Sequence, residues 1–367
     1  MPTIRCVSCR QAYPAEGLPH VCPSCGGVFD FDGPPLFDPA QVDPRQPGMW
    51  RYRAAFDLFS GAPVVTLGEG QTPLVWVQKD GRSIGLKLES LNPTGSYKDR
   101  GTAVLISQLQ ARGAESAVED SSGNAGASFA AYAARAGMRG RVFVPASASG
   151  PKRIQIEAYG AELAAVAGPR SAAAAAVMEE VRTGAVYASH AYLPFGLSGI
   201  ATIAYEIWET LGGAPGTVVA PAGHGGLLLG LVRGFAALEQ AGLIARAPFY
   251  VGVQAAACAP MAEAFAQGLR QPAAAAENAT LAEGVRVTQP VRAAALLHEI
   301  PPGKGLFTAV PEADIWPAAQ ALNRQGIYVE PTSALVWAAL SQVPVNLPEP
   351  VILILTGNGL KYIPTAS

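Results

Sequence analysis

A single lysine stands where a tight turn passes into a predicted helix. The segment Asn92–Gly101 reads Asn-Pro-Thr-Gly-Ser-Tyr-Lys-Asp-Arg-Gly, so a Pro-Thr-Gly turn delivers Lys98 to the start of the helix. Helix N-termini carry partial positive charge and disfavour a cation. A lysine at such a place suits chemistry that needs a neutral amine, such as a Schiff base with an aldehyde cofactor.

A serine- and glycine-containing turn could bind a carboxylate. Ser121, Ser122, Gly123 and Asn124 precede an alanine-rich segment that predicts a helix. Serine and asparagine cap helices, and the free N–H groups of a first helical turn can hold an anion. Taken alone, the pattern is equally well interpreted as an ordinary N-cap.

A glycine loop could bind a phosphate group. It contains Gly223, His224, Gly225 and Gly226, which follow an apolar strand and precede an apolar helix. Glycines let the backbone approach a phosphate, whose charge then lies at the helix N-terminus. The loop is not a P-loop, because no Gly-Lys-Ser/Thr follows, and Leu228 stands where a dinucleotide loop has its third glycine. A phosphate site for a smaller cofactor fits better, although strand-to-helix glycine turns are common and a lone loop histidine is usually structural.

The last apolar strand ends at Thr356. Open α/β sheets bind ligands at the carboxyl ends of their strands, and a threonine hydroxyl there can hydrogen-bond a neutral ring nitrogen. An ordinary turn is the alternative interpretation. Together the four segments supply an amine, a carboxylate-binding turn, a phosphate loop and a hydroxyl for a ring nitrogen, which is the set that a pyridoxal 5′-phosphate (PLP) site requires.

Four of the five cysteines form two CxxC pairs near the N-terminus, Cys6 with Cys9 and Cys22 with Cys25. Two such pairs can close a tetrahedron of thiolates around zinc, and four thiolates leave no open coordination position. We therefore expect a structural Zn²⁺ ion in a reducing compartment, with two chance pairs as the alternative. Cys258 is expected to be a buried apolar residue.

Strands and helices alternate along the rest of the chain. Continuously apolar, β-branched runs predict buried parallel strands at Thr217–Ala220, Phe249–Val253 and Val351–Leu355, and shorter runs predict strands at Ile84–Leu88 and Arg141–Val144. Helices are predicted at Thr102–Arg112, Asn124–Ala136, Lys152–Tyr159, Ser171–Arg182 and Leu227–Leu238. This alternation predicts an α/β protein with doubly wound, mostly parallel sheets. The Ala273–Ala276 run is expected in a loop or a frayed helix, and Gly33–Gly48, rich in proline, in an extended linker.

The composition favours an enzyme that acts on a small molecule. With 367 residues, 50% of them hydrophobic and 15% charged, the chain can form two main domains with large cores. A net charge of −2 gives no general attraction to nucleic acid or to an anionic membrane. We see no signal peptide and no uninterrupted transmembrane stretch, and expect a cytoplasmic protein.

Several segments spread over the chain resemble threonine synthase, a member of the tryptophan synthase β (fold type II) group of PLP enzymes. They are Leu67–Leu74, Lys87–Gly101, Ser121–Ala127, Gln155–Ala161, Thr202–Glu206 and Glu330–Ala334. These motifs specify the superfamily strongly and the substrate weakly. The resemblance implies two doubly wound domains and a homodimer, and a four-cysteine ribbon is found in some threonine synthase-like chains. The expected domains are a zinc ribbon (1–30), a proline-rich connector (31–48), a large PLP domain (49–95 with 205–367) and a smaller mobile domain (96–204).

The resemblance also implies a role for each site residue. Lys98 would form the Schiff base, Asn124 would bond the cofactor's 3′-oxygen, and Thr356 would face the pyridine nitrogen. Tyr97, where phenylalanine is usual, would lie beside the ring. The remaining predicted contacts are backbone N–H groups of Gly223, His224, Gly225 and Gly226 for the 5′-phosphate, and Ser121, Ser122 and Gly123 for the substrate carboxylate.

Departures from the family pattern leave the substrate open. Threonine synthases carry a polar residue where this chain has Ala125, and a serine, an arginine and a lysine where the alignment gives Ala191, Gly196 and Ala201. No Lys or Arg occurs between residues 184 and 211, and Lys152 or Arg153 could substitute from a neighbouring loop. The leading hypothesis is a threonine synthase-like lyase that converts O-phosphohomoserine to L-threonine.

Two alternatives stay open. One is a β-eliminating or β-replacing enzyme on serine, threonine or phosphoserine-type substrates, like threonine dehydratase or cysteate synthase. A remote one is a non-catalytic zinc-ribbon interaction protein.

Overall fold

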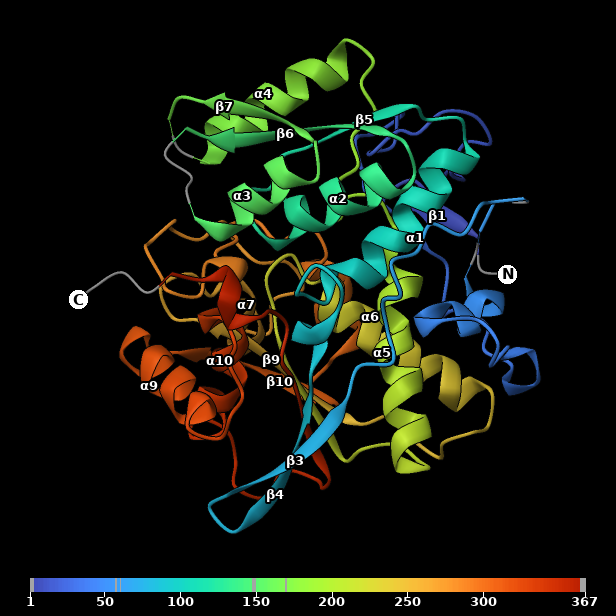
Figure 1. The fold of residues 1–367 in the computed structure, drawn as a ribbon. Helices are drawn as coiled ribbons and strands as arrows, with labels where there is room; N and C mark the ends of the chain where they lie inside the picture. The colour runs from blue at the N-terminus through green and yellow to red at the C-terminus, as the bar shows by residue number, and fades with distance from the viewer. Residues whose placement is uncertain (1–2, 57, 60, 147–149, 169, 364–367) are drawn as a thin grey trace. The chain divides into compact units, whose positions relative to one another are not determined.

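The computed structural model describes residues 3–56, 58–59, 61–146, 150–168 and 170–363. The chain forms two compact units (Figure 1). The first contains Met1–Glu69, Asn92–Gly199 and Lys361–Ser367, and the second contains Gly70–Leu91 and Ile200–Leu360. The domain boundaries expected from the sequence, and the mobility expected for residues 96–204, stay predictions.

The first unit is built on a three-stranded parallel sheet with helices on both faces (Figure 1). Its strands are β5 (Ser116–Glu119), β6 (Arg139–Pro145) and β7 (Glu162–Val166). Its helices are α1 (Lys98–Ala111), α2 (Asn124–Arg135), α3 (Pro151–Ala158) and α4 (Arg170–Arg182). Val118, Phe143 and Val177 are buried between the sheet and α4, where their apolar surface leaves water.

A small ribbon begins the first unit. The antiparallel strands β1 (Ile4–Cys6) and β2 (Phe29–Phe31) hold it together. Tyr13 packs edge-to-face on Phe195, with ring centroids 5.3 Å apart. Arg112, the C-cap of α1, donates hydrogen bonds to the carbonyls of Pro14 and Ala15 at 3.2 and 3.0 Å. The connector contains the 3₁₀ helix η1 (Pro39–Gln41) and leads into η2 (Gly48–Ala55), so it is less extended than predicted.

The second unit is built on a six-stranded sheet in the order β10-β9-β8-β11-β4-β3. All neighbours are parallel except β3 and β4, which form an antiparallel hairpin. The strands are β3 (Leu74–Lys79), β4 (Arg82–Lys87), β8 (Thr217–Pro221), β9 (Phe249–Ala255), β10 (Gly305–Val310) and β11 (Val351–Ile354). The helices are α5 (Gly196–Leu211), α6 (Gly226–Gln240), α7 (Pro260–Ala266), α8 (Ala293–Glu299), α9 (Glu312–Asn323) and α10 (Pro331–Ala339). The first residues of α5, up to Gly199, belong to the first unit.

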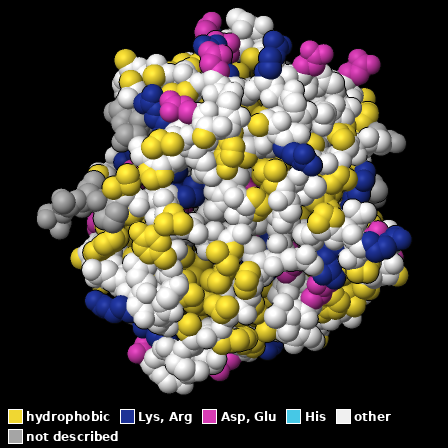
Figure 2. All heavy atoms as spheres, viewed as in Figure 1, with side chains coloured by type: hydrophobic (Ala, Val, Ile, Leu, Met, Phe, Trp, Pro, Cys, Tyr) yellow, Lys and Arg dark blue, Asp and Glu magenta, His cyan; other side chains and the backbone are white. Residues whose placement is uncertain are grey.

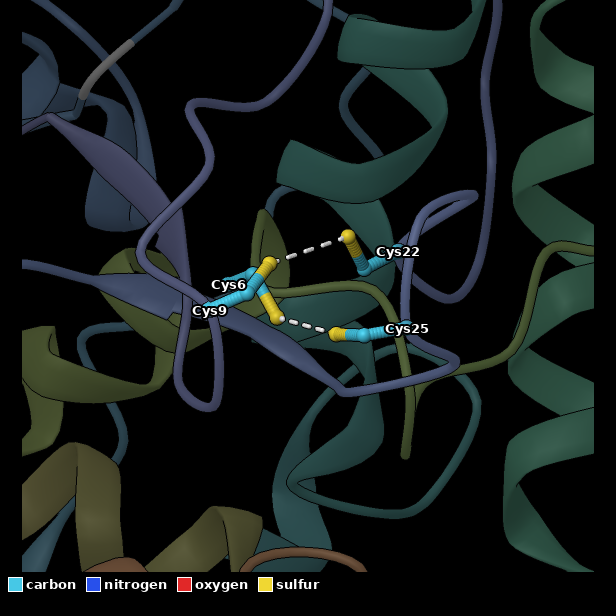
Figure 3. Close-up of side chains that lie close together, drawn as sticks. All are labelled: Cys6, Cys9, Cys22 and Cys25. Carbon is cyan, nitrogen blue, oxygen red and sulfur yellow. Dashed lines mark hydrogen bonds between the residues drawn. The ribbon is translucent and has the colours of Figure 1, made fainter.

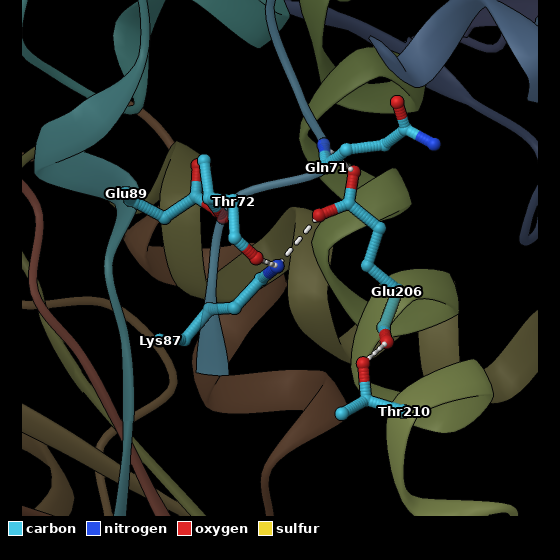
Figure 4. Close-up of polar contacts among 6 residues, drawn as sticks. All are labelled: Gln71, Thr72, Lys87, Glu89, Glu206 and Thr210. Atoms are coloured by element: carbon cyan, nitrogen blue, oxygen red, sulfur yellow. Dashed lines mark hydrogen bonds and ion pairs between the residues drawn. The ribbon is translucent and has the colours of Figure 1, made fainter. Parts of the chain in front are cut away.

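A buried ion pair ties β4 to α5 in the second unit (Figure 4). Lys87 Nζ lies 2.6 Å from Glu206 Oε2 and donates a second hydrogen bond to the Thr72 carbonyl at 2.6 Å. The Gln71 N–H donates to the other Glu206 oxygen at 2.7 Å, and Thr72 Oγ1 donates to the buried Glu89 at 2.6 Å. The loop before β3 is therefore held by charged groups that the apolar pattern did not reveal.

The predicted α/β class with mostly parallel sheets is confirmed, as are the predicted strands and helices. Strand ends shift by two residues at most, and α1 begins four residues earlier than Thr102, at Lys98. Residues 273–276 form no helix, and Cys258 is buried, as expected. Among the described residues, no helix is long and apolar enough to cross a membrane. On the face drawn in Figure 2, acidic and basic side chains stand singly or in mixed groups.

Candidate functional site

Lys98 is the first residue of α1, as the sequence predicts. It is half-buried, and its Nζ lies 4.9 Å from the centre of the Tyr97 ring. Tyr97 caps the helix without a side-chain hydrogen bond. The N–H groups of Asp99 and Arg100 donate to the carbonyls of Ser96 and Tyr97 at 3.4 and 3.2 Å, so the turn continues directly into the helix that carries the amine.

Asp99, the residue after Lys98, holds the preceding turn in place through hydrogen bonds. Asp99, fully buried, accepts hydrogen bonds from the Thr94 N–H at 2.7 Å, from Thr94 Oγ1 at 2.6 Å and from Ser128 Oγ of α2 at 2.7 Å. Lys361 Nζ and Gln155 Nε2 both donate to the Thr94 carbonyl, at 2.7 and 3.1 Å. Burial raises the pKa of Asp99 to about 6, while the hydrogen bonds oppose that rise. Asp99 thus fixes the direction in which Lys98 leaves the turn and joins the starts of α1 and α2.

The predicted carboxylate-binding turn precedes α2. Gly123 is the N-cap with extended backbone and no side-chain cap, and Ser121 Oγ accepts a hydrogen bond from its N–H at 3.2 Å. A Cβ at Gly126 would lie 1.8 Å from the Ser121 carbonyl oxygen, so only glycine lets the turn approach the helix this closely. Ser122, Gly123 and Asn124 are half-buried, which leaves the start of α2 open to an anion.

A cluster of titratable side chains lies at the carboxyl end of β5 and is absent from the sequence prediction. Glu119, fully buried, accepts a hydrogen bond from the His190 ring at 3.0 Å, and the half-buried Asp120 accepts one from Tyr187 Oη at 2.8 Å. Val118 exchanges backbone hydrogen bonds with residues 186 and 188, so the segment that ends in His190 runs beside β5. The Glu-Asp pair directly before Ser121 is the one signal in the sequence that could have pointed to it.

In the second unit, the glycine loop and Thr356 follow neighbouring strands. The loop joins β8 to α6, and Thr356 comes two residues after β11, which pairs with β8 in parallel. Gly225 has φ +96°, a left-handed conformation, and a Cβ at Gly223 would lie 2.8 Å from the Gly284 carbonyl oxygen. A glycine-rich loop, in which His224 is the one large side chain, therefore leads to the N-terminus of a 15-residue helix, where an anion is favoured.

Thr356 is buried and paired with a second hydroxyl. Its Oγ1 lies 3.0 Å from Ser333 Oγ, and Ser333 Oγ accepts a hydrogen bond from the Gly357 N–H at 2.8 Å. Ser333 was missed as a site residue, although it stands in the Glu330–Ala334 motif. Two neutral hydroxyls suit a neutral ring nitrogen better than a pyridinium, which takes a carboxylate partner.

The residues present fit PLP in each unit separately. The first unit supplies the amine, the Asn124 side chain and the open turn, and the second supplies the glycine loop and the hydroxyl pair. Ser96 Oγ is buried with no hydrogen-bond partner among the described residues, two positions before Lys98. A buried donor of this kind suits a polar ligand.

The four cysteines come together as predicted (Figure 3). Their sulfur atoms lie within 4.8 Å of one another, with Cys6 and Cys25 3.5 Å apart and Cys9 and Cys22 3.6 Å apart. A zinc tetrahedron with Zn–S bonds of about 2.3 Å has S···S edges of about 3.8 Å, whereas a disulfide bond is only about 2 Å long. A Cβ at Gly27 would lie 2.8 Å from Cys6 Sγ, so glycine leaves room beside the thiols.

One departure from the threonine synthase pattern has a structural cause. Gly196 begins α5, and a Cβ there would lie 2.9 Å from the Gly101 carbonyl oxygen. A Cβ at Gly199 would lie 2.1 Å from the Arg100 carbonyl oxygen. The start of α5 thus packs on the backbone of α1 and has no room for the arginine that the alignment expects at Gly196.

Residues 65–357 match the family of pyridoxal-phosphate dependent enzymes, and the chain belongs to this family. The threonine synthase of Methanocaldococcus jannaschii is 32% identical and aligns over 97% of this chain and 92% of its own length. The threonine synthase of Synechocystis is 36% identical over 84% of this chain and 82% of its own. Among solved structures, a threonine deaminase from T.th. matches with a TM-score of 0.65 and 29% identity, over 80% of this chain and 94% of that one.

Proposed function

We propose that this chain is a PLP-dependent carbon–oxygen lyase of the threonine synthase kind, acting on an amino acid with a leaving group on its β or γ carbon. The relation to threonine synthases over most of the chain carries the proposal. The position of Lys98 at the start of α1 supports it. The first candidate reaction is the one named for those relatives, in which O-phosphohomoserine gives L-threonine.

Each proposed contact is taken from the residues described above. PLP, when bound, supplies an electron sink for the substrate's α-carbon. Lys98 would hold the cofactor and accept the α-proton, and Asn124 would bond the 3′-oxygen. The backbone of Gly223, His224, Gly225 and Gly226 would hold the phosphate, and Ser121, Ser122 and Gly123 would hold the substrate carboxylate.

Thr356, supported by Ser333, would leave the ring nitrogen unprotonated, which favours elimination or replacement over amino-group transfer. The proposed proton acceptor is a single amine, and a positioned acid or base of this kind contributes about 10²–10⁴-fold to rate. Lys98→Ala is therefore the control variant for the assay of phosphate release.

The holo-protein with O-phosphohomoserine tests the first candidate. We expect release of inorganic phosphate in equal amounts with threonine, and no release from Lys98→Ala. An absence of phosphate release at full cofactor occupancy would exclude this substrate.

A second candidate, β-elimination or β-replacement on serine, threonine or phosphoserine, is favoured by a specific observation. No Lys or Arg stands between residues 184 and 211, and the packing of Gly196 leaves no room for one at that position. The likeness to a threonine deaminase agrees with it. Formation of a 2-oxo acid from one of these amino acids would support it.

The finer features follow the same reasoning. The four cysteines would hold a structural Zn²⁺ ion, since their sulfur separations match a thiolate tetrahedron. We also propose a homodimer, from the resemblance, and a cytoplasmic location, where thiols stay reduced. Sedimentation of the holo-protein would test the dimer.

A further inference from the structure

We propose that Glu119, Asp120 and His190 select a substrate amino acid whose side chain ends in a hydroxyl group over one whose side chain ends in phosphate. The inference rests on the proposed function, because it chooses between the two substrate classes left open there. We call these three residues the acidic wall. Glu119 and Asp120 lie at the carboxyl end of β5, directly before the turn Ser121–Gly123, and His190 contacts Glu119 from the segment that runs beside β5.

The acidic wall lies within electrostatic reach of Lys98. The charge of Lys98 acts on both Glu119 and His190, and the charge of Arg170 acts on all three residues of the wall. Carboxyl ends of parallel strands are where α/β proteins bind their ligands. We therefore place the side chain of a substrate, held by its carboxylate at Ser121–Gly123, beside the acidic wall.

The charges of the acidic wall oppose a phosphate dianion. Burial raises the pKa of Asp120 to about 6, helped by the charge of Glu119, so Asp120 is mostly ionised at pH 7. Burial also raises the pKa of Glu119, and its hydrogen bonds from Asp120 oppose that rise. The charges of Arg170 and Lys98 act on the acidic wall, and its carboxyl groups offset them. Phosphate needs charge-assisted donors when it is taken out of water, and carboxyl groups supply none.

The hydrogen-bonding character of His190 points the same way. Burial, and then the charge of Lys98, hold its pKa well below the usual 6.5, so the ring is neutral at pH 7. A neutral ring whose Nδ1–H donates to Glu119 carries its acceptor lone pair on Nε2. Together with the two carboxyl groups, the acidic wall is therefore rich in hydrogen-bond acceptors, which suit the proton of a hydroxyl group, whereas a phosphate dianion offers only acceptor oxygens.

The positions that would supply phosphate contacts in the family pattern are closed. A side chain at Gly196 would meet the backbone of Gly101, and Ala191 is buried. Loss of basic contacts and presence of an acidic wall are separate observations, and both disfavour a phosphorylated side chain.

Matched pairs of amino acids test the inference with the holo-protein. Serine is compared with O-phosphoserine, and homoserine with O-phosphohomoserine, as ratios of kcat/KM. We expect the wild type to favour the hydroxyl member of a pair. The double variant Glu119→Gln/Asp120→Asn should lower that ratio by at least about tenfold, because the negative charge of the acidic wall is removed. Glu162→Gln, an exposed carboxylate on β7 of the same unit, should leave the ratio unchanged.

The cofactor spectrum separates failure of this inference from failure of the proposed function. If no amino acid changes the absorbance of the holo-protein, the proposed function falls and the inference falls with it. If amino acids change the spectrum but the phosphorylated member is preferred, or the ratio does not move in the double variant, only the acidic wall is refuted.

Inorganic phosphate gives a second measurement that needs only the single variant Asp120→Asn. Phosphate should inhibit this variant at a concentration at least about tenfold lower than it inhibits the wild type. Equal inhibition of the two proteins would overturn the inference even if the double variant does not fold.

Discussion

The buried pair of Lys87 and Glu206 allows a quantitative test of how burial sets the strength of an ion pair. The two side chains are 1% and 5% exposed, with 2.6 Å between Nζ and Oε2. Glu206→Gln removes the negative charge and keeps the shape of the side chain. Lys87 then keeps the Thr72 carbonyl as a partner, and the Gln71 N–H keeps an amide oxygen.

The expected loss follows from leaving a charge buried without its counter-charge. Breaking a buried pair costs about 3–5 kcal/mol, and we expect about 3 kcal/mol because neutral partners remain. The protein contains a matched control in Arg182 and Glu179, which are also 2.6 Å apart but 70% and 63% exposed. Glu179→Gln should cost less than about 1 kcal/mol, since water screens an exposed pair.

Urea unfolding followed by tryptophan fluorescence measures the difference at a fixed PLP concentration. Four of the five tryptophans belong to the second unit, namely Trp76, Trp208, Trp316 and Trp337, so the signal reports mainly on the unit that holds the pair. A double variant Glu206→Gln/Lys87→Met removes both charges and should recover part of the loss. Equal losses for Glu206→Gln and Glu179→Gln would refute the reasoning.

Four further predictions concern the candidate site and the ribbon. Lys98→Ala should lose at least about a hundredfold in turnover and lose the absorbance of the covalently held cofactor, because its amine is the proposed proton acceptor; retained turnover in a kinetic assay would contradict its role. Ser333→Ala should weaken PLP binding about fivefold, the value of about one hydrogen bond, in a fluorescence titration, and an unchanged dissociation constant would remove Ser333 from the site. Cys25→Ser should lower zinc content from about one ion per chain towards none in metal analysis, since a tetrahedral site needs all four thiolates; a wild type purified without zinc would contradict it. The pKa of Asp99 rises from 3.8 to about 6 on folding, so the folded chain binds a proton more firmly and its free energy of unfolding falls as pH rises from 4 to 6. Asp99→Asn should remove on the order of 3 kcal/mol of this pH-dependent change in the free energy of unfolding, measured by urea unfolding at several pH values. Glu119 and Asp120 should account for the pH dependence that remains.

Features that depend on neighbours in the chain could be predicted from the sequence. The apolar runs of β8, β9 and β11 predict buried parallel strands because such strands lose both faces to the core. Lys98 was expected at a helix start from the turn residues before it, and the four cysteines from their spacing. In each case a short segment carries the whole physical reason.

Features that depend on distant segments could not be predicted. Glu119 and His190 are 71 residues apart and meet only because the chain after α4 returns beside β5. Lys87 and Glu206 are 119 residues apart, and neither breaks the apolar pattern of its element enough to reveal a partner. The short strands β5 and β7 lack a long apolar run, because their sheet has only three strands and is partly exposed.

This difference between local and long-range features explains why the cofactor is easier to infer from the sequence than the substrate. The contacts proposed for the cofactor come from turns and helix starts, whose sequence signals are local: Pro-Thr-Gly before Lys98, Ser-Gly-Asn before α2 and Gly-His-Gly-Gly before α6. The contacts proposed for a substrate side chain come from groups that packing brings to the end of β5. If that proposal holds, a chain can keep the cofactor motifs of the threonine synthases while Glu119 and Asp120 change the charge that the substrate meets. Relatives that share those motifs are then evidence for the reaction type, and the residues at the end of β5 are the place to test the substrate.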